Sequence, residues 1–170
     1  NGHEVTLWTH DPHEIEMLST KREQQEKLPG VKLPDNISIE ADLETALTDE
    51  DVVVMAVPSP VVRTVAKQMS PFVKDGQIIV NVAKGIEDVT YKTLSDIIEE
   101  EIPNAEVCVL SGPSHAEEVG IGIPTTVVIG AKNKKTAEML QDVFMNKVFR
   151  VYTSSDIIGI ELGGALKNVI

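Results

Sequence analysis

Asp51-Val52-Val53-Val54-Met55-Ala56-Val57 is apolar at every position after its first residue. A strand with one face in water would alternate between apolar and polar residues, because successive side chains point to opposite faces of a sheet. A run that is apolar on both faces is typical of a parallel sheet that is covered on both sides. The stretch therefore predicts a buried strand of such a sheet.

The apolar pattern on either side of this stretch alternates between two periods. Short β-branched runs predict strands at Val5–Thr9, Val52–Val57, Gln77–Val82, Glu106–Leu110, Thr125–Gly130 and Val148–Tyr152. Helical spacing predicts stripes of Val61, Val62, Val65, Ala66 and Met69, of Tyr91, Leu94, Ile97 and Ile98, and of Ala137, Leu140, Val143 and Phe144. The segment 27–36 contains two prolines and a glycine and is interpreted as a loop. Alternating strands and helices predict βαβ units, hence an α/β fold with a Rossmann-like, doubly wound, mostly parallel sheet.

Composition narrows the class of protein. The 170 residues are enough for one domain with a core, and the net charge of −12 disfavours nucleic acid and anionic membranes as partners. The single cysteine, Cys108, excludes an intramolecular disulfide framework, and no apolar run reaches membrane-spanning length. We expect a cytoplasmic protein without nucleic-acid partners or stable membrane association. An anionic ligand would need a local site made of lysines and backbone N–H groups.

Ligands of open parallel sheets bind outside the carboxyl ends of the strands. The residues that follow the predicted strands are therefore the candidates for function, and they are His10-Asp11, Pro58-Ser59, Lys84-Gly85 and Gly112-Pro113-Ser114. Lys84 is interpreted either as a surface lysine at a turn or as an ammonium that faces a phosphate or a carbonyl oxygen. His10 and His13 flank Asp11-Pro12 without a third ligand, so no metal site is predicted. Pro12 is expected at the first position of a helix, and Asp11 could meet a ribose hydroxyl.

The corner Ser111–Glu118 has three interpretations. Ser114 and Glu117 have the spacing of a capping box, which stabilises a helix start without any ligand. A helix start can also offer N–H groups to an anion, so Gly112 and Ser114 are candidates for ligand contact. Glycine and serine between a strand and a helix also resemble the nucleophile elbow of a serine hydrolase. No histidine follows His115, which weakens that last interpretation.

The final segment carries the candidate base, Lys167. Ile158, Leu162, Ala165, Leu166 and Val169 form a helical stripe. Gly163 and Gly164 precede Lys167 by four and three residues, so they share its face of the helix, and each costs about 1 kcal/mol relative to alanine. The glycines predict a close approach on that face, for helix packing or for a ligand. Desolvation there would lower the pKa of Lys167 and suit proton transfer.

Several motifs together resemble a known family. Six segments occur in the order found in bacterial NAD(P)-dependent glycerol-3-phosphate dehydrogenases. They are Asn1-Gly2-His3-Glu4-Val5-Thr6-Leu7-Trp8, Ala56-Val57-Pro58-Ser59, Ala83-Lys84-Gly85, Leu110–Ala116, Phe149–Tyr152 and Gly163–Val169. The resemblance implies NAD or NADP as cofactor and hydride transfer between nicotinamide and sn-glycerol 3-phosphate or dihydroxyacetone phosphate, which supplies phospholipid synthesis. It implies a small phosphate substrate as partner, and it leaves a homodimer open.

The same resemblance assigns roles to residues. Lys167 matches the proton acceptor, and Lys84, Gly112, Ser114 and Lys167 match substrate contacts. His10, Asp11, Lys84 and Ala116 match contacts to the dinucleotide. Many members have arginine at the position of Asp11, where it favours the 2′-phosphate of NADP, so the choice between NAD and NADP stays open.

The resemblance also predicts the domain organisation. Residues 1–153 are expected to be a dinucleotide-binding domain that lacks its first strand and its G-x-G-x-x-G loop, which is absent from the sequence. Residues 154–170 are expected to begin the helix that leads into a helical substrate domain. Such a fragment is expected to be inactive alone. The alternatives are a β-hydroxyacid dehydrogenase, a serine hydrolase and a non-catalytic nucleotide-binding module.

Overall fold

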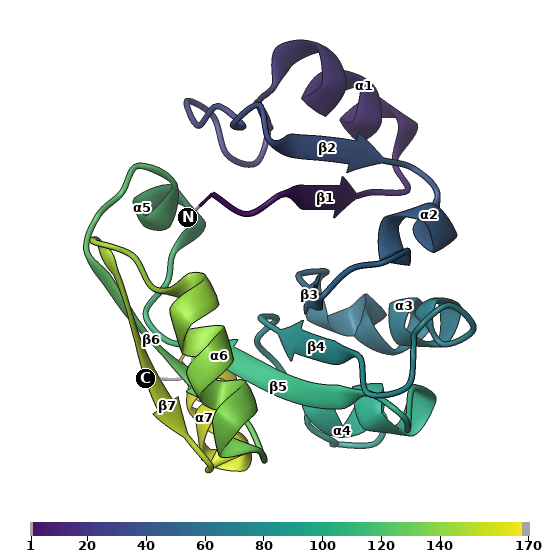
Figure 1. The fold of residues 1–170 in the computed structure, drawn as a ribbon, viewed down its shortest axis with the longest axis vertical. Coiled ribbons are helices and arrows are strands. Elements are labelled where there is room, and N and C mark those ends of the chain that lie inside the picture. Colours follow the sequence, from purple (N-terminus) through teal and green to yellow (C-terminus); the bar gives the residue numbers. More distant parts are fainter. Residues whose placement is uncertain (1, 168–170) are drawn as a thin grey trace.

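The computed structural model describes residues 2–167, which form two β-sheets with helices packed around them (Figure 1). The strands are β1 (Val5–Trp8), β2 (Ile37–Glu40), β3 (Val52–Met55), β4 (Ile78–Asn81), β5 (Glu106–Ser111), β6 (Thr125–Gly130) and β7 (Phe149–Ser154). The helices are α1 (Pro12–Lys21), α2 (Leu43–Leu47), the 3₁₀ helix η1 (Ser59–Val61), α3 (Val62–Met69), α4 (Leu94–Glu101), α5 (Ala116–Gly120), α6 (Lys134–Phe144) and α7 (Ile157–Leu166).

The larger sheet has the strand order β3-β4-β5-β6-β7. Its neighbouring strands are parallel except for β5 and β6, which run antiparallel with Leu110 opposite Ile129. The prediction of an α/β, Rossmann-like and mostly parallel sheet is confirmed. Sequence periodicity does not report strand direction, so the antiparallel pair was not foreseen.

The core lies on both faces of this sheet. Ile79 of β4 packs with the apolar side of α3 and α4, whereas its neighbour Val80 packs on the opposite face with α6. Both side chains are fully buried. Because successive side chains point to opposite faces, one apolar strand supplies both layers of the core. The double covering explains why these strands are apolar throughout.

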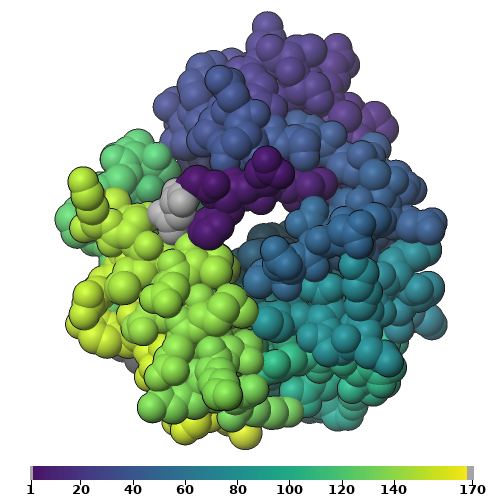
Figure 2. All heavy atoms as spheres, viewed as in Figure 1, coloured from purple at the N-terminus to yellow at the C-terminus, as the bar shows by residue number. Residues whose placement is uncertain are grey.

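The pair β1–β2 forms a separate parallel sheet. In the space-filling view an opening lies between this N-terminal unit, coloured purple and blue, and the rest of the molecule (Figure 2). Strand β3 is at the edge of the larger sheet, and its Val54 side chain is 44 % exposed. The prediction that the stretch 51–57 is covered on both faces is therefore wrong for Val54 and for Ala56, which are both exposed within residues 2–167. The reason is the edge position of β3, which periodicity cannot reveal.

Helix boundaries follow local chemistry, with one correction. Thr93 caps α4 by accepting a hydrogen bond from the Asp96 N–H, and α4 begins at Leu94. Tyr91, which was predicted in the apolar stripe of this helix, precedes the cap, has a positive φ of 58° and is 82 % exposed. The spacing of Tyr91 matched a helix that starts only after it. Pro12 is the first residue of α1, as predicted.

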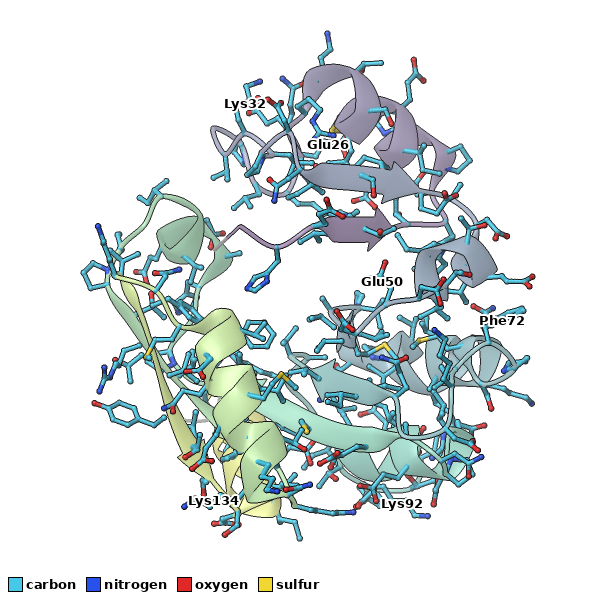
Figure 3. All side chains as sticks on the ribbon, in the orientation of Figure 1. Glu26, Lys32, Glu50, Phe72, Lys92 and Lys134 are labelled. Atoms are coloured by element: carbon cyan, nitrogen blue, oxygen red, sulfur yellow. The ribbon has the colours of Figure 1, made fainter. Side chains whose placement is uncertain are left out.

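Charged side chains cover the outer surface, as Lys32, Lys92 and Lys134 illustrate (Figure 3). One ion-paired cluster is more enclosed. Arg63 of α3 binds Glu87 at 2.6 Å, Glu100 at 2.9 Å and Glu101 at 2.8 Å. Glu87 follows Lys84 by three residues, and Glu100 and Glu101 are on α4. The ion pairs of Arg63 therefore connect the segment after β4 with α3 and α4.

Within residues 2–167, no helix combines the length and the apolar character that crossing a bilayer requires.

Candidate active site

The turn after β4 presents Lys84. Asn81, the last residue of β4, is fully buried and binds Ala83 twice, by accepting from its N–H at 3.1 Å and by donating to its carbonyl at 3.2 Å. These two bonds hold the backbone in a fixed turn immediately before Lys84. Asn81 was not among the predicted site residues. The sequence did contain a signal for Asn81, because a polar residue at the end of an apolar strand is unusual and indicates a specific hydrogen-bonding role.

Lys84 reaches across to the corner after β5. Its Nζ donates to the Gly112 carbonyl at 2.9 Å and to Ser114 Oγ at 3.4 Å. The pKa of Lys84 is lowered, first by burial and then by the positive charge of Lys167. Lys84, Gly112 and Ser114 therefore form one cluster, and the helix that leads to Lys167 packs against this cluster at Gly164. These four are the residues predicted to contact substrate.

Gly112 lies where no side chain fits. A Cβ at this position would be 2.7 Å from the Thr126 carbonyl oxygen and 2.9 Å from Val127 Cα. The corner after β5 therefore rests directly on the backbone of β6. The Gly112 carbonyl accepts hydrogen bonds from Lys84 Nζ and from the Ser114 N–H, each at 2.9 Å.

Ser114 does not cap a helix, so the capping-box interpretation is wrong. The N-cap of α5 is His115, without a side-chain cap bond, and α5 begins at Ala116. The Ser114 hydroxyl instead lies 3.4 Å from both Lys84 Nζ and the Gly112 carbonyl oxygen. In the part of the chain that the structure describes, no histidine is bonded to Ser114. The Ser114 contacts therefore give no support to a hydrolase nucleophile.

Lys167 follows the last turn of α7. Gly164 lies against the corner, because a Cβ there would be 2.7 Å from Ser111 Oγ and 3.5 Å from Lys84 Cγ. Around Gly163 there is open space. The close approach predicted from the two glycines therefore occurs at Gly164 alone, and it brings the helix of Lys167 against Lys84.

One expectation about α7 differs from the structure, and its apolar stripe is largely exposed. Ile158, Leu162 and Leu166 are 60 %, 38 % and 50 % exposed, so the apolar stripe does not face the core of residues 2–167. The buried residue of α7 is Glu161. Lys167 is itself exposed, so the desolvation predicted for it is found at Lys84 instead. Val169 lies outside the described residues.

The residues predicted to contact a dinucleotide occupy different elements. His10 follows β1 and its ring lies 6.0 Å from that of Trp8. Asp11 is the N-cap of α1 and accepts from the His13 N–H at 2.9 Å. Ala116 is the exposed first residue of α5. The described contacts of His10 and Asp11 are local, and none joins them to the lysine cluster.

The chain is similar to a family of known proteins. A family model described as NAD-dependent glycerol-3-phosphate dehydrogenase N-terminus matches residues 1–137. A curated relative from Agathobacter rectalis, named glycerol-3-phosphate dehydrogenase [NAD(P)+], is 60 % identical over 170 residues, which are all of this chain and 51 % of the relative. A relative of the same name from Fusobacterium nucleatum is 55 % identical over 172 residues and is likewise covered to 51 %.

A solved structure agrees with these matches. The crystal structure of glycerol-3-phosphate dehydrogenase from Coxiella burnetii superposes with a TM-score of 0.93 at 27 % identity, covering 99 % of this chain and 51 % of that chain. The chain therefore spans about half the length of the relatives that it matches.

Proposed function

The chain belongs to the NAD-dependent glycerol-3-phosphate dehydrogenase family, and from this premise we propose that it is the dinucleotide-binding half of such an oxidoreductase. The reaction is hydride transfer between NAD(P) and C2 of sn-glycerol 3-phosphate, with dihydroxyacetone phosphate as the ketone. We propose further that this reaction supplies glycerol 3-phosphate for phospholipid synthesis.

One observation carries the proposal. Lys84 and Lys167 are separated by more than eighty residues of sequence, yet Gly164, three residues before Lys167, lies against Ser111 and Lys84, and Lys84 donates to the Gly112 carbonyl. A phosphorylated substrate is an anion, and the Lys84 ammonium beside this polar corner supplies a local positive charge in a chain whose net charge is −12. The cluster therefore offers the local attraction for an anion that the whole chain lacks.

The proposed roles follow from what each group can do. Lys167 in its neutral form accepts the proton of the C2 hydroxyl as the C2 hydride leaves. Lys84 stabilises negative charge on the same oxygen, and Ser114 binds the substrate through its hydroxyl. The Gly112 carbonyl holds the Lys84 ammonium in place. In the reverse direction Lys167 returns the proton.

The chain also has residues that suit a dinucleotide. Lys84 and Ala116 follow β4 and β5, at the strand ends where ligands of parallel sheets bind, and His10 and Asp11 follow β1. Asp11 uses Oδ1 in its cap, which leaves Oδ2 as an acceptor for a ribose hydroxyl. When bound, nicotinamide accepts or donates the hydride. These residues would bind and orient it.

The domain organisation is part of the proposal. Residues 1–153 would form the dinucleotide-binding domain, and residues 154–170 would lead into a helical substrate domain. The exposed apolar residues of α7 suit packing against such a domain. The opening between β1 and β3 suits a further strand that carries a glycine-rich loop, because the doubly wound strand order places the first strand there.

The test uses the full-length protein. It should oxidise glycerol 3-phosphate with NAD or NADP and leave 3-hydroxy acids untouched, whereas activity on hydroxy acids alone would indicate a β-hydroxyacid dehydrogenase. Lys167→Ala should lower kcat by about 10²- to 10⁴-fold, the usual contribution of a general base, with nearly unchanged cofactor affinity. Turnover at the parent rate in this variant would refute the assignment of Lys167. Cofactor binding without any turnover in the parent would indicate a binding module.

A further inference from the structure

Glu161 is a buried carboxylate with no role in the reaction described above. It lies in the middle of α7 and is only 6 % exposed, whereas its apolar neighbours Ile158 and Leu162 face outward. In residues 2–167 no lysine, arginine or histidine forms an ion pair with it. Burying a charged group without a partner is costly, so its hydrogen bonds must account for its position.

Both described hydrogen bonds of Glu161 come from Ser95, which precedes it by 66 residues. The Ser95 N–H donates to Oε1 at 2.9 Å, and Ser95 Oγ donates to Oε2 at 2.5 Å. Ser95 is the second residue of α4, where backbone N–H groups lack partners inside the helix. Thr93 Oγ1 accepts from the Asp96 N–H, so Thr93 and Glu161 each accept one backbone hydrogen bond in the first turn of α4. A carboxylate is stabilised at this end of a helix.

The junction of Glu161, Ser95 and Thr93 contacts both segments that carry lysines. Glu161 is on α7, one helical turn before Gly164 and less than two turns before Lys167. Thr93 forms an antiparallel bridge with Ile86, two residues after Lys84. Ser95 and Thr93 are joined through their hydroxyls at 3.1 Å. A chain of short contacts therefore runs from the helix of Lys167 to the segment of Lys84.

We propose that Glu161 is a positioning residue: it docks α7 on the first turn of α4 and thereby sets the placement of Lys167 relative to Lys84. Ile157 and Ile160 pack against Gly130 of β6, but apolar contacts are non-directional and Ile158, Leu162 and Leu166 are exposed, so apolar packing specifies the rotation of α7 less sharply than directional bonds do. Two hydrogen bonds from one serine to both oxygens of a carboxylate are directional. The catalytic consequence of this docking rests on the proposed function, but the docking itself does not.

The test compares three variants of the full-length protein with a matched control. Glu161→Ala removes both bonds and should lower kcat by about 10- to 100-fold, as small displacements of a reacting group do, while the KM for the nicotinamide cofactor stays near the parent value. Glu161→Gln keeps an oxygen for the Ser95 N–H and can donate to Ser95 Oγ, so it should retain most of kcat. Ser95→Ala should fall between the two. Glu138→Gln, at an exposed pair with Lys134 on α6, should leave kcat unchanged.

A second readout needs no activity. A short amine-reactive crosslinker, followed by mass spectrometry of the peptides, should join Lys84 to Lys167 in the parent and in Glu161→Gln. The yield should drop in Glu161→Ala.

A third readout combines two substitutions. In a Lys167→Ala background, Glu161→Ala should lower the residual rate no further, because its effect acts through Lys167. An additive loss would indicate a general structural role and overturn the proposal.

The remaining outcomes are also decisive. If Glu161→Ala does not fold, two variants remain informative. Ser95→Ala removes the hydroxyl hydrogen bond and keeps the carboxylate, whereas Glu161→Gln removes the negative charge and keeps groups that can form both hydrogen bonds. Docking would be refuted if Ser95→Ala and Glu161→Ala both kept the kcat and the crosslinking yield of the parent. It would also be refuted if Glu161→Gln lost as much kcat as Glu161→Ala while its crosslinking yield stayed unchanged. A parent without activity on glycerol 3-phosphate would refute the proposed function alone, because the crosslinking still reports on docking.

Discussion

The Lys84 ammonium lies 2.9 Å from the carbonyl oxygen of Gly112, which is 28 residues further along the chain. This bond joins the turn after β4 to the corner after β5. It needs Asn81 to shape the first turn and the missing side chain of Gly112 to let the corner rest on β6. The cationic site is therefore built from two neighbouring strand ends before α7 adds Lys167.

Replacing Lys84 tests the cationic site. Lys84→Met keeps much of the aliphatic stem and removes the charge, so it should raise the KM for glycerol 3-phosphate and lower kcat. The loss in kcat/KM should be at least tenfold, because a hydrogen bond from a charged donor contributes about 1.5–3 kcal/mol. Steady-state kinetics of the full-length enzyme measure both constants. Lys74→Met, at an exposed pair with Asp49, is the control, and equal behaviour of the two variants would contradict the assignment.

The paired glycines of α7 give opposite expectations. Gly164→Ala places a Cβ 2.7 Å from Ser111 Oγ, so the Ser111 hydroxyl must rotate or α7 must shift beside Lys84, and turnover should fall. Gly163→Ala meets open space and should raise helix stability by up to about 1 kcal/mol, with turnover retained. Thermal unfolding and kcat of the two variants are compared side by side. Equal activity would show that the close approach is not needed for the reaction.

The Arg63 cluster predicts a dependence of stability on pH. Hydrogen bonding to Arg63, then to Thr90, lowers the pKa of Glu87 from 4.5 to about 2. Because the folded state holds this carboxylate deprotonated, its stabilisation is complete above the unfolded pKa and is lost as the pH falls toward 2. Glu87→Gln should therefore lower the unfolding temperature at pH 7, and the difference from the parent should shrink between pH 4.5 and about 2. A difference that is constant with pH would contradict this account.

Asp11 tests cofactor choice separately from helix capping. Asparagine is as good an N-cap as aspartate, so Asp11→Asn should leave thermal stability unchanged. It removes a negative charge that would repel a 2′-phosphate, so the ratio of kcat/KM for NADP to that for NAD should rise. Asp11→Ala should instead lose about 0.5–2 kcal/mol of stability, the usual contribution of such a cap. An unchanged cofactor ratio in Asp11→Asn would place Asp11 away from the dinucleotide.

Sequence periodicity predicted most of the fold, with errors that have a common origin. The strands around Ile79 and Val109 were identified correctly because a doubly covered strand is apolar at every position, and the strand around Val53 was identified from the same kind of run although its Val54 is exposed. Strand β2 was missed because Ile37–Glu40 is short and alternating. Tyr91 was misplaced because its spacing fits a helix whose cap, at Thr93, comes after it. A local sequence pattern predicts which type of secondary structure a segment can form, but it does not predict the residue at which that element begins.

The candidate site shows the same division. Lys84, Ser114 and Lys167 were named as candidates from the sequence, because strand ends and glycines inside a helix are local signals. The roles of Asn81 and Glu161 were missed, since a buried polar residue is recognised only when its partner is known. The capping interpretation of Ser114 failed for that reason as well, because Lys84, thirty residues away, is the partner of its hydroxyl.

The sequence by itself determined most of the order of strands and helices, the strand ends that carry polar residues, and the small residues that allow close packing. Only the tertiary structure decided that β6 runs against β5, that Val54 lies at an edge, and that Glu161 rather than the apolar stripe of α7 faces inward. The physical reason is range. Periodicity and capping act within a few residues, whereas the pairing of Lys84 with Gly112 and of Glu161 with Ser95 exists only after distant segments have packed together.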